Sequence, residues 1–189
     1  LIIGLVLLFV GLVMNFTLQD YLLEKSLSDL ESLAELQELR LEQVIEKDFE
    51  RINGVTSRTQ LRISLQDYNA TGNPESQAKI ESIIADARDS LSDFRNISIV
   101  NPEGTVVAST GGLVVGENIA DQNYFSAAQV ADYISPVTPN QGDIPTMYLS
   151  GPLVRDDQFL GVAVMESDPT DVLSVTTDYI SAFGETGET

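Results

Sequence analysis

The stretch TMYLSGPLVRDDQFLGVAVMES, residues 146–167, decides the fold because it contains two consecutive strands and the turn between them. Over residues 147–154 alternate side chains face the same side, which is the period of a strand that is half buried. Residues 155–158 form a polar break of hairpin length, and residues 159–165 are then apolar on both faces. The stretch therefore predicts an antiparallel hairpin whose second strand is central and covered on both sides.

Three residues of this hairpin mark special backbone positions. Pro152 has no amide hydrogen to donate to a neighbouring strand, so it predicts a bulge or an edge at that point. Gly151 and Gly161 predict places where another group approaches the backbone closely.

Composition excludes several classes of function. The 189 residues suit one domain of ordinary size and an extended segment, and the formal net charge of −19 excludes nucleic acid as a partner. The chain has neither Cys nor His, which rules out disulfides, zinc–thiolate sites and Ser-His-Asp or Cys-His catalysis. No calcium-loop pattern is present either, so we expect no metal site, no cofactor and no enzymatic activity.

The first residues, LIIGLVLLFVGLV, carry no charge, and with Met14 and Phe16 the apolar run reaches about 16 residues, against the ~20 that cross a bilayer. We predict a transmembrane helix over residues 1–17, truncated at its front because the chain begins with Leu. A secretory signal peptide is the alternative, but it would need a basic start and a small-residue cleavage site, and the sequence has neither. The acidic residues that follow fit an extracytoplasmic exit.

A long amphipathic helix is predicted over residues 18–68, which contain no Pro and a single Gly, Gly54. Its apolar stripe comprises Leu23, Leu27, Leu30, Ala34, Leu41 and Val44. The nearly heptad spacing is typical of a parallel dimer seam, and packing on the chain's own domain would produce the same stripe.

The rest of the chain predicts alternating short elements. The predicted order is a break at 68–74, a helix at 75–94, strands at 97–101 and 105–109, a loop at 110–123, a short helix at 123–131, a strand at 133–137, a loop at 138–145, the hairpin, and a helix at 168–182. These elements predict an α+β sandwich of five antiparallel strands with helices on one side.

Several stretches together resemble the extracellular Cache sensor domain, a PAS-like fold of membrane receptors. They are ISIVNPEG at 97–104, VVAS at 106–109, DQNYFSAA at 121–128, PTMYLSGPLV at 145–154 and FLGVAV at 159–164. The resemblance covers nearly the whole chain and implies a PAS-like sensor domain over residues 69–183. The tail GETGET, residues 184–189, resembles the start of the membrane-proximal subdomain of double-Cache receptors, which makes this the membrane-distal part.

The resemblance also implies where a ligand binds: between the sheet and a cover formed by residues 110–131 and the 138–145 loop. Family members that bind amino acids have an Arg and aromatic residues in the segment matching residues 121–125, and an Asp after the last strand. Here Gln122 replaces the Arg, so the charge that would hold a carboxylate in bidentate fashion is absent. We therefore expect no amino-acid ligand of the usual family type.

The predicted ligand-binding residues are Asp121, Gln122, Tyr124, Phe125, Tyr133, Tyr148, Ser150 and Asp168. Structural roles are the alternative for most of them. Tyr124 and Phe125 could belong to the core of the cover, while Asp121 and Asp168 stand where helix N-caps are expected. Tyr148 and Ser150 share one face of their strand, and Gln122 suits a neutral or hydroxylated ligand.

These expectations combine into one function. The resemblance implies the extracytoplasmic sensor domain of a transmembrane receptor, of histidine-kinase type first, with small-molecule binding relayed through helices to a cytoplasmic output domain. Its expected partners are an unidentified small molecule, the membrane through the N-terminal helix, and a second copy in a homodimer. The alternative is a membrane-anchored dimeric scaffold that binds protein, has no small-molecule ligand and presents a flat cover.

Overall fold

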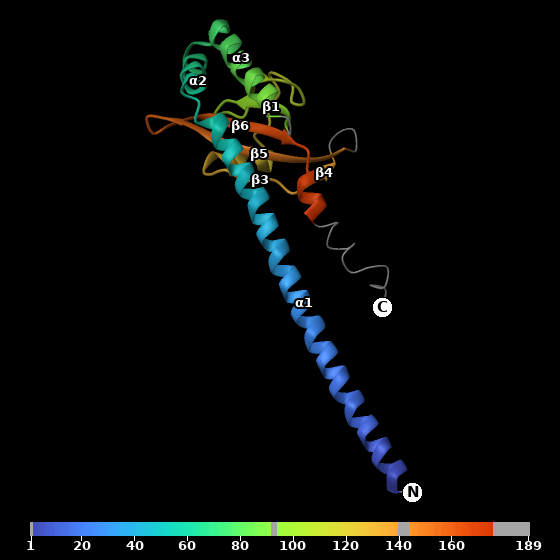
Figure 1. Ribbon diagram of the computed structural model, residues 1–189. Coiled ribbons are helices and arrows are strands. Elements are labelled where there is room, and N and C mark those ends of the chain that lie inside the picture. Colours follow the sequence, from blue (N-terminus) through green and yellow to red (C-terminus); the bar gives the residue numbers. More distant parts are fainter. Residues whose placement is uncertain (1, 92–93, 140–143, 176–189) are drawn as a thin grey trace. The chain divides into compact units, whose positions relative to one another are not determined.

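The computed structural model describes the backbone of residues 2–91, 94–139 and 144–175. The chain divides into two units, Leu1–Gln43 with Val175–Thr189, and Val44–Ser174. The second unit contains the sheet, which Figure 1 shows with its helices labelled. The end of the predicted last helix, residues 176–182, and the predicted subdomain start at 184–189 lie outside the described residues.

Helix α1, Ile2–Thr56, runs through the first unit into the second. Within the first unit many large apolar side chains are exposed: Met14, Leu18, Tyr21, Leu22, Leu23, Leu27, Leu30, Leu36, Leu39 and Leu41. In the described part of the chain, no helix is both long and apolar enough to cross a membrane. Most side chains of the predicted transmembrane segment, residues 1–17, lie outside that part.

The prediction of one helix over residues 18–68 is wrong at its end. Helix α1 stops at Thr56, and α2 begins at Thr59 after an extended Arg58 (φ −63°, ψ 109°). Gly54 lies in the last turn of α1, but neither Pro nor Gly occupies residues 57–58 at the break itself, so the local signal is weak. Packing explains it, because Val55 at the end of α1 and Leu61 and Leu65 in α2 are all buried in one core.

Two helices with clear sequence signals cover one face of the sheet. Helix α2, Thr59–Thr71, ends at left-handed Gly72, whose amide donates to the Tyr68 carbonyl at 2.8 Å. Helix α3, Pro74–Ser90, starts at the N-cap Asn73, whose side chain accepts from the Glu75 amide at 3.0 Å. It ends four residues before the predicted Phe94, which belongs to the first strand instead.

The sheet is antiparallel, with strand order β2-β1-β6-β5-β3. Its strands are β1 (Phe94–Val100), β2 (Val106–Ser109), β3 (Tyr133–Ile134), β4 (Thr138–Pro139), β5 (Pro145–Arg155) and β6 (Gln158–Ser167). Six strands replace the predicted five, because Thr138 and Pro139 pair with Thr146 and Pro145 at the start of β5. The α+β class is confirmed; the predicted strand at 133–137 is shorter, and the predicted loop at 138–145 contains β4.

The β5–β6 hairpin forms as predicted. Its pairing runs from Met147 opposite Ser167 to Arg155 opposite Gln158, and the turn residues Asp156 and Asp157 have φ of 50° and 60°, as in a type I′ turn. Pro152 lies at an edge, as one of the two alternatives predicted, because β3 pairs with β5 only up to Ser150. Pro152 itself is in register with Val162, and the register of β5 shifts one residue further on, between Leu153 and Val154.

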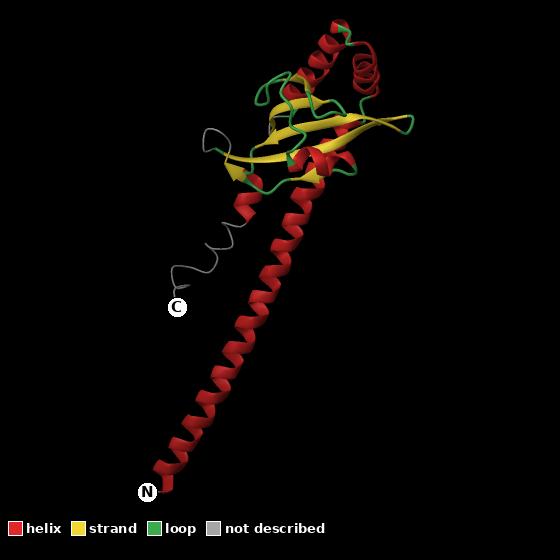
Figure 2. Ribbon diagram, turned by 180° about the vertical axis from the view of Figure 1, so that it is seen from behind, coloured by secondary structure: helices red, strands yellow, loops and turns green. Residues whose placement is uncertain are grey.

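Each face of the sheet has its own core. One core joins the sheet to the end of α1, to α2 and to α3 and includes Ile52, Leu65, Ile84, Ile97, Leu149 and Met165. The other contains Val100, Val106, Ile119, Phe125, Ala128, Val162 and Val164, under α4 (Asn123–Ser126) and the 3₁₀ turn Ala127–Gln129. Helical structure therefore covers both faces, not one as predicted, and Figure 2 shows the short helical segment opposite α2 and α3.

Both glycines of the hairpin stand where another group approaches. A Cβ on Gly151 would lie 2.5 Å from the Ile52 Cγ2 atom of α1 and 2.5 Å from an Asp132 carboxylate oxygen. A Cβ on Gly161, whose φ is +142°, would lie 2.0 Å from the Val100 carbonyl oxygen of β1. Gly161 therefore permits both the backbone conformation and the close β1–β6 pairing.

The Gly161→Ala variant should lose about 2 kcal/mol or more of unfolding free energy, because its methyl group would collide with the Val100 carbonyl. Urea denaturation of the purified chain measures the loss. The matched control is Gly54→Ala in α1, where a Cβ has nothing within 4 Å. That change should stabilise the chain by ~0.5–1 kcal/mol through helix propensity. Equal effects of the two variants would contradict the assigned role of Gly161.

Candidate ligand-binding site

An open pocket of about 490 Å³ lies on the face of the sheet opposite α2 and α3. Its lining consists of Leu113, Glu117, Gln122, Asn123, Tyr124, Tyr133, Ser135, Pro136, Thr138, Pro139 and Tyr148. These residues come from the 110–123 loop, α4, the β3–β4 segment and β5. The volume lies within the range of roughly 300–1,000 Å³ that is typical of small-molecule sites.

A stacked tyrosine pair forms one wall of this pocket. The rings of Tyr124 and Tyr148 have centroids 4.3 Å apart and planes inclined by 20°. The Ser150 hydroxyl donates to the Tyr124 carbonyl at 2.6 Å, and the Tyr148 amide donates to the Ser135 hydroxyl at 2.9 Å. The backbones of both tyrosines are thus tied to the neighbouring polar residues, which fixes the aromatic wall in place.

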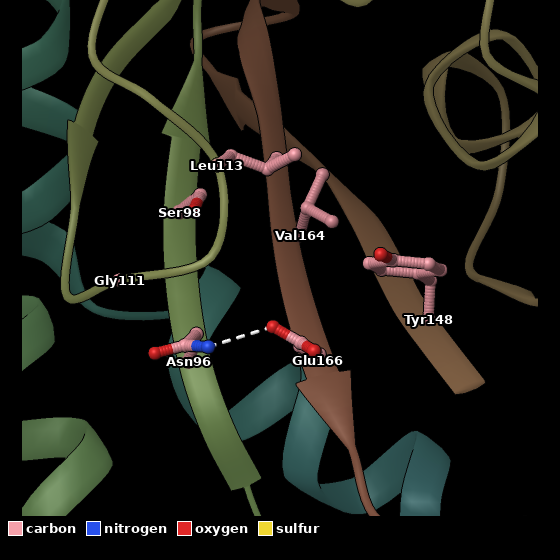
Figure 3. Close-up of a pocket in the computed structure, with 7 residues that line it drawn as sticks. All are labelled: Asn96, Ser98, Gly111, Leu113, Tyr148, Val164 and Glu166. Carbon is pink, nitrogen blue, oxygen red and sulfur yellow. Dashed lines mark hydrogen bonds between the residues drawn. The ribbon is translucent and has the colours of Figure 1, made fainter. Parts of the chain in front are cut away.

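A second, much smaller hollow of about 10 Å³ adjoins the pocket and shares Leu113 and Tyr148 with it. Figure 3 shows its lining on β1, β5 and β6, with the loop carrying Gly111 and Leu113 beside them. The Asn96 amide nitrogen donates to the Glu166 carboxylate at 2.6 Å. A Cβ on Gly112 (φ +79°) would lie 2.6 Å from that carboxylate, so glycine lets the loop approach Glu166.

The site is electrostatically negative. No Lys or Arg belongs to the described lining of either pocket, whereas Glu117 lines the larger one and Glu166 the smaller. Burial first, and then the charges of Tyr148, Glu117 and Glu166, raise the pKa of Tyr124 to about 12. Burial, followed by the Glu166 and Glu117 carboxylates, also raises the pKa of Tyr148. Both phenols are therefore neutral at physiological pH.

Four predicted site residues line the pocket together: Gln122, Tyr124, Tyr133 and Tyr148. Phe125 is only 1% exposed and packs in the core under α4. Ser150 is fully buried and holds the backbone of Tyr124. Asp121 is exposed and belongs to neither pocket lining. Direct ligand contact by these last three residues stays a prediction.

Asp168 lies apart from both linings and has two structural partners. Its carboxylate accepts from the Thr170 amide at 3.0 Å, which is the N-cap geometry that the sequence suggested. The other oxygen pairs with Arg95 at 2.7 Å. The Thr170 side-chain hydrogen bond and then Arg95 lower the pKa of Asp168. A ligand-binding role for Asp168 also stays a prediction.

Sequence reasoning missed the two carboxylates of the site. Glu166 could have been found, because it lies directly opposite Tyr148 in the β5–β6 register and shares the face of Val162 and Val164. Glu117 stands in an irregular loop, where no periodicity tells which way a side chain points. No cluster of three or more acidic residues in the described part of the chain could hold a metal ion.

No family model and no curated protein matches this chain. Solved structures do match. The sensor domain of the V. cholerae histidine kinase DctB has a TM-score of 0.58 at 14% identity, covering 75% of this chain and 57% of that one. The ligand-binding domain of the Campylobacter jejuni chemoreceptor Tlp3, solved with 4-methylisoleucine, has a TM-score of 0.61 at 12% identity, covering 76% and 59%.

The ligand-binding domain of the Pseudomonas aeruginosa amino acid chemoreceptor PctC, solved with GABA, matches with a TM-score of 0.57 at 16% identity. The match covers 77% of this chain and 63% of that one. This chain thus spans about three fifths of the length of each of these three solved domains. It has the fold of receptor sensor domains, and the fold implied by the resemblance to Cache domains is confirmed.

The tyrosine wall can be tested by alkaline titration followed through tyrosinate absorbance. Among the six tyrosines, one component should titrate near pH 12, and Tyr124→Phe should remove it. Because the folded pKa exceeds that of a free phenol, Tyr124's contribution to stability is complete below pH ~10 and is lost as the pH rises toward 12. Tyr21→Phe, on an exposed tyrosine of α1, should leave that component unchanged. Persistence of the component in Tyr124→Phe would refute this assignment.

Proposed function

We propose that this chain is the extracytoplasmic sensor part of a transmembrane signalling receptor and binds a small molecule in the tyrosine-lined pocket. The observation that carries the proposal is the pocket of about 490 Å³ between the sheet and its cover. It occurs in a fold shared with domains described as sensor or ligand-binding domains. Aromatic walls with a few polar groups are the usual composition of such sites.

The pocket also supports this function over that of a protein-binding scaffold, which would present a flat cover. Here Leu113 and Glu117 from one loop, and Thr138 and Pro139 from another segment, stand around Tyr148 of the sheet. That arrangement is concave and has both apolar and polar walls. Solved structures with this fold are described as sensor or ligand-binding domains, which supports a binding module.

Strand β5 connects the pocket to helix α1. Tyr148 and Ser150 face the pocket side, and Leu149 and Gly151 between and beside them face the helix side. The Ile52 side chain of α1 lies so close to Gly151 that a Cβ there would be 2.5 Å from it. A ligand that draws the cover toward Tyr148 would therefore press on β5, and the end of α1 packs against the other side of this strand.

Signalling then requires two states of different ligand affinity. A ligand shifts the equilibrium between them only by the difference in its binding free energies. The exposed ion pair between Lys47 of α1 and Asp171, 3.6 Å apart, adds a second connection between α1 and the segment after β6. Such a pair contributes little stability, so it can break and re-form as the two segments shift.

The proposed layout adapts the predicted order to the observed helices. Residues 1–17 form the membrane helix, the rest of α1 extends from it, α2 and the residues up to 183 form the sensor, and residues 184–189 start a further subdomain. The nearly heptad stripe and the exposed leucines of α1 support a homodimer through this helix. A histidine kinase is the proposed output, with a cyclase or chemoreceptor output as alternatives.

The pocket can be blocked by Gln122→Trp. Gln122 lines the pocket and its side chain makes no helix-capping hydrogen bond, so an indole there should fill the space without removing a helix cap. A solute at a hundred times its Kd should stabilise the wild type by about 2.7 kcal/mol and leave the variant's melting temperature unchanged. A library of metabolites screened by thermal melting measures this.

The matched control is Gln129→Trp, which adds the same ring at an exposed position outside both linings. This variant should respond to the solute as the wild type does. Equal loss of response in both variants, or a response retained by Gln122→Trp, would place the binding site elsewhere.

A further inference from the structure

We infer that the pocket takes a small organic cation, a protonated amine or quaternary ammonium without a carboxylate group. This inference rests on the proposed function and names the ligand class of the same site. Three properties of the lining support it: its aromatic faces, its carboxylates, and the placement of the chain's basic residues.

Three tyrosines from separate elements converge on the pocket. Tyr124 comes from α4, Tyr133 from β3 and Tyr148 from β5. The faces of aromatic rings attract ammonium groups through the ring quadrupole, and sets of such rings bind methylated ammonium ions. Because Tyr124 and Tyr148 are stacked with ring centroids 4.3 Å apart, each ring has one face against the other, and its outer face remains for a cation.

Two carboxylates make the potential beside this wall negative. Glu117 lines the pocket directly, and Glu166 lies opposite Tyr148 in the sheet and lines the adjoining hollow. Their charges both act to raise the pKa of the two phenols, so the field of each reaches the aromatic wall. An anion placed there would meet the same repulsion, whereas a cation would be attracted.

Several of the chain's basic residues are engaged away from the pocket. Arg51 pairs with Asp48, Arg95 with Asp168, Arg155 with Asp156 and Gln66, and Lys47 with Asp171. Arg62 donates to the carbonyls of Val154 and Ser57. A ligand carboxylate would find no guanidinium or ammonium group in the described lining, and burying it unpaired would be costly.

A bare metal ion fits the site less well than an organic cation. In the part of the chain that the structure describes, no three acidic side chains are grouped to coordinate a metal. The pocket is also far larger than a coordination site and mostly walled by rings and neutral polar groups. A diffuse positive charge on a carbon framework matches both the volume and the aromatic faces.

Pairs of amines and their parent amino acids isolate the effect of the carboxylate. We would titrate the purified chain at low ionic strength with agmatine and arginine, cadaverine and lysine, and tyramine and tyrosine, with choline as the quaternary probe. At least one amine should bind, and each binding amine should bind at least tenfold more tightly than its parent. Isothermal titration calorimetry measures both affinities.

Charge-neutralising variants assign the effect to the pocket. Glu117→Gln keeps an oxygen that can accept from the Val114 amide but removes the charge, and it should weaken amine binding about tenfold. Glu103→Gln is the matched control, because Glu103 is exposed in the β1–β2 turn and lines neither pocket. It should leave the affinity unchanged. Thermal melts without ligand establish that both variants are folded.

The outcomes separate this inference from the function on which it rests. An amino acid that binds as tightly as its amine, or an amine affinity unaffected by Glu117→Gln, would overturn the cation assignment. Binding of succinate or ribose alone, abolished by Gln122→Trp, would overturn it too and leave the sensor function standing. If no solute of any charge stabilises the chain, both the inference and the sensor function fail.

Discussion

The two-sided packing of β5 is the constraint on which the rest of the structure depends. Met147, Leu149 and Leu153 on one side belong to the core with the helices, while Tyr148 on the other forms the pocket wall. The strand can serve both sides only because its side chains alternate and because its partner β6 is apolar on both faces. A shift of one residue in register would place Tyr148 against the helices and Leu149 in the pocket, so the hairpin turn also determines the site.

Close backbone approach is the second requirement, and three of the glycines that meet it bear on the sheet and the site. Gly161 lets β6 approach β1, Gly151 lets α1 approach β5, and Gly112 lets the cover loop approach Glu166. The first two could be predicted, since a glycine inside an apolar strand weakens that strand and usually marks a bulge or a close contact with its backbone. The third stands in a loop rich in glycine, where the sequence does not tell which residue faces the sheet.

Prediction from the sequence succeeded where a period or a stop signal was present. The hairpin, a helix break within residues 68–74, and the shared face of Tyr148 and Ser150 all follow from local rules. Prediction failed where contacts between distant parts of the chain determine the local structure. The break after Thr56 exists because Val55 and Leu61 enter one core, and α4 takes Phe125 into the core while turning Tyr124 to the pocket. Two adjacent aromatic residues in a short helix carry no signal of which one is buried.

The proposed function requires a mechanical connection between the negative pocket and helix α1, and strand β5 lies between the two. In the proposed mechanism, a cation between Tyr148 and the cover would offset the negative charges of Glu117 and Glu166, so it would favour a closed cover over an open one. Closure would press on β5. On the opposite side of this strand Gly151, which has no Cβ, lies against Ile52 of α1. Because packed interiors transmit displacement and do not absorb it, the strand can convert a local change of charge into a movement of the helix.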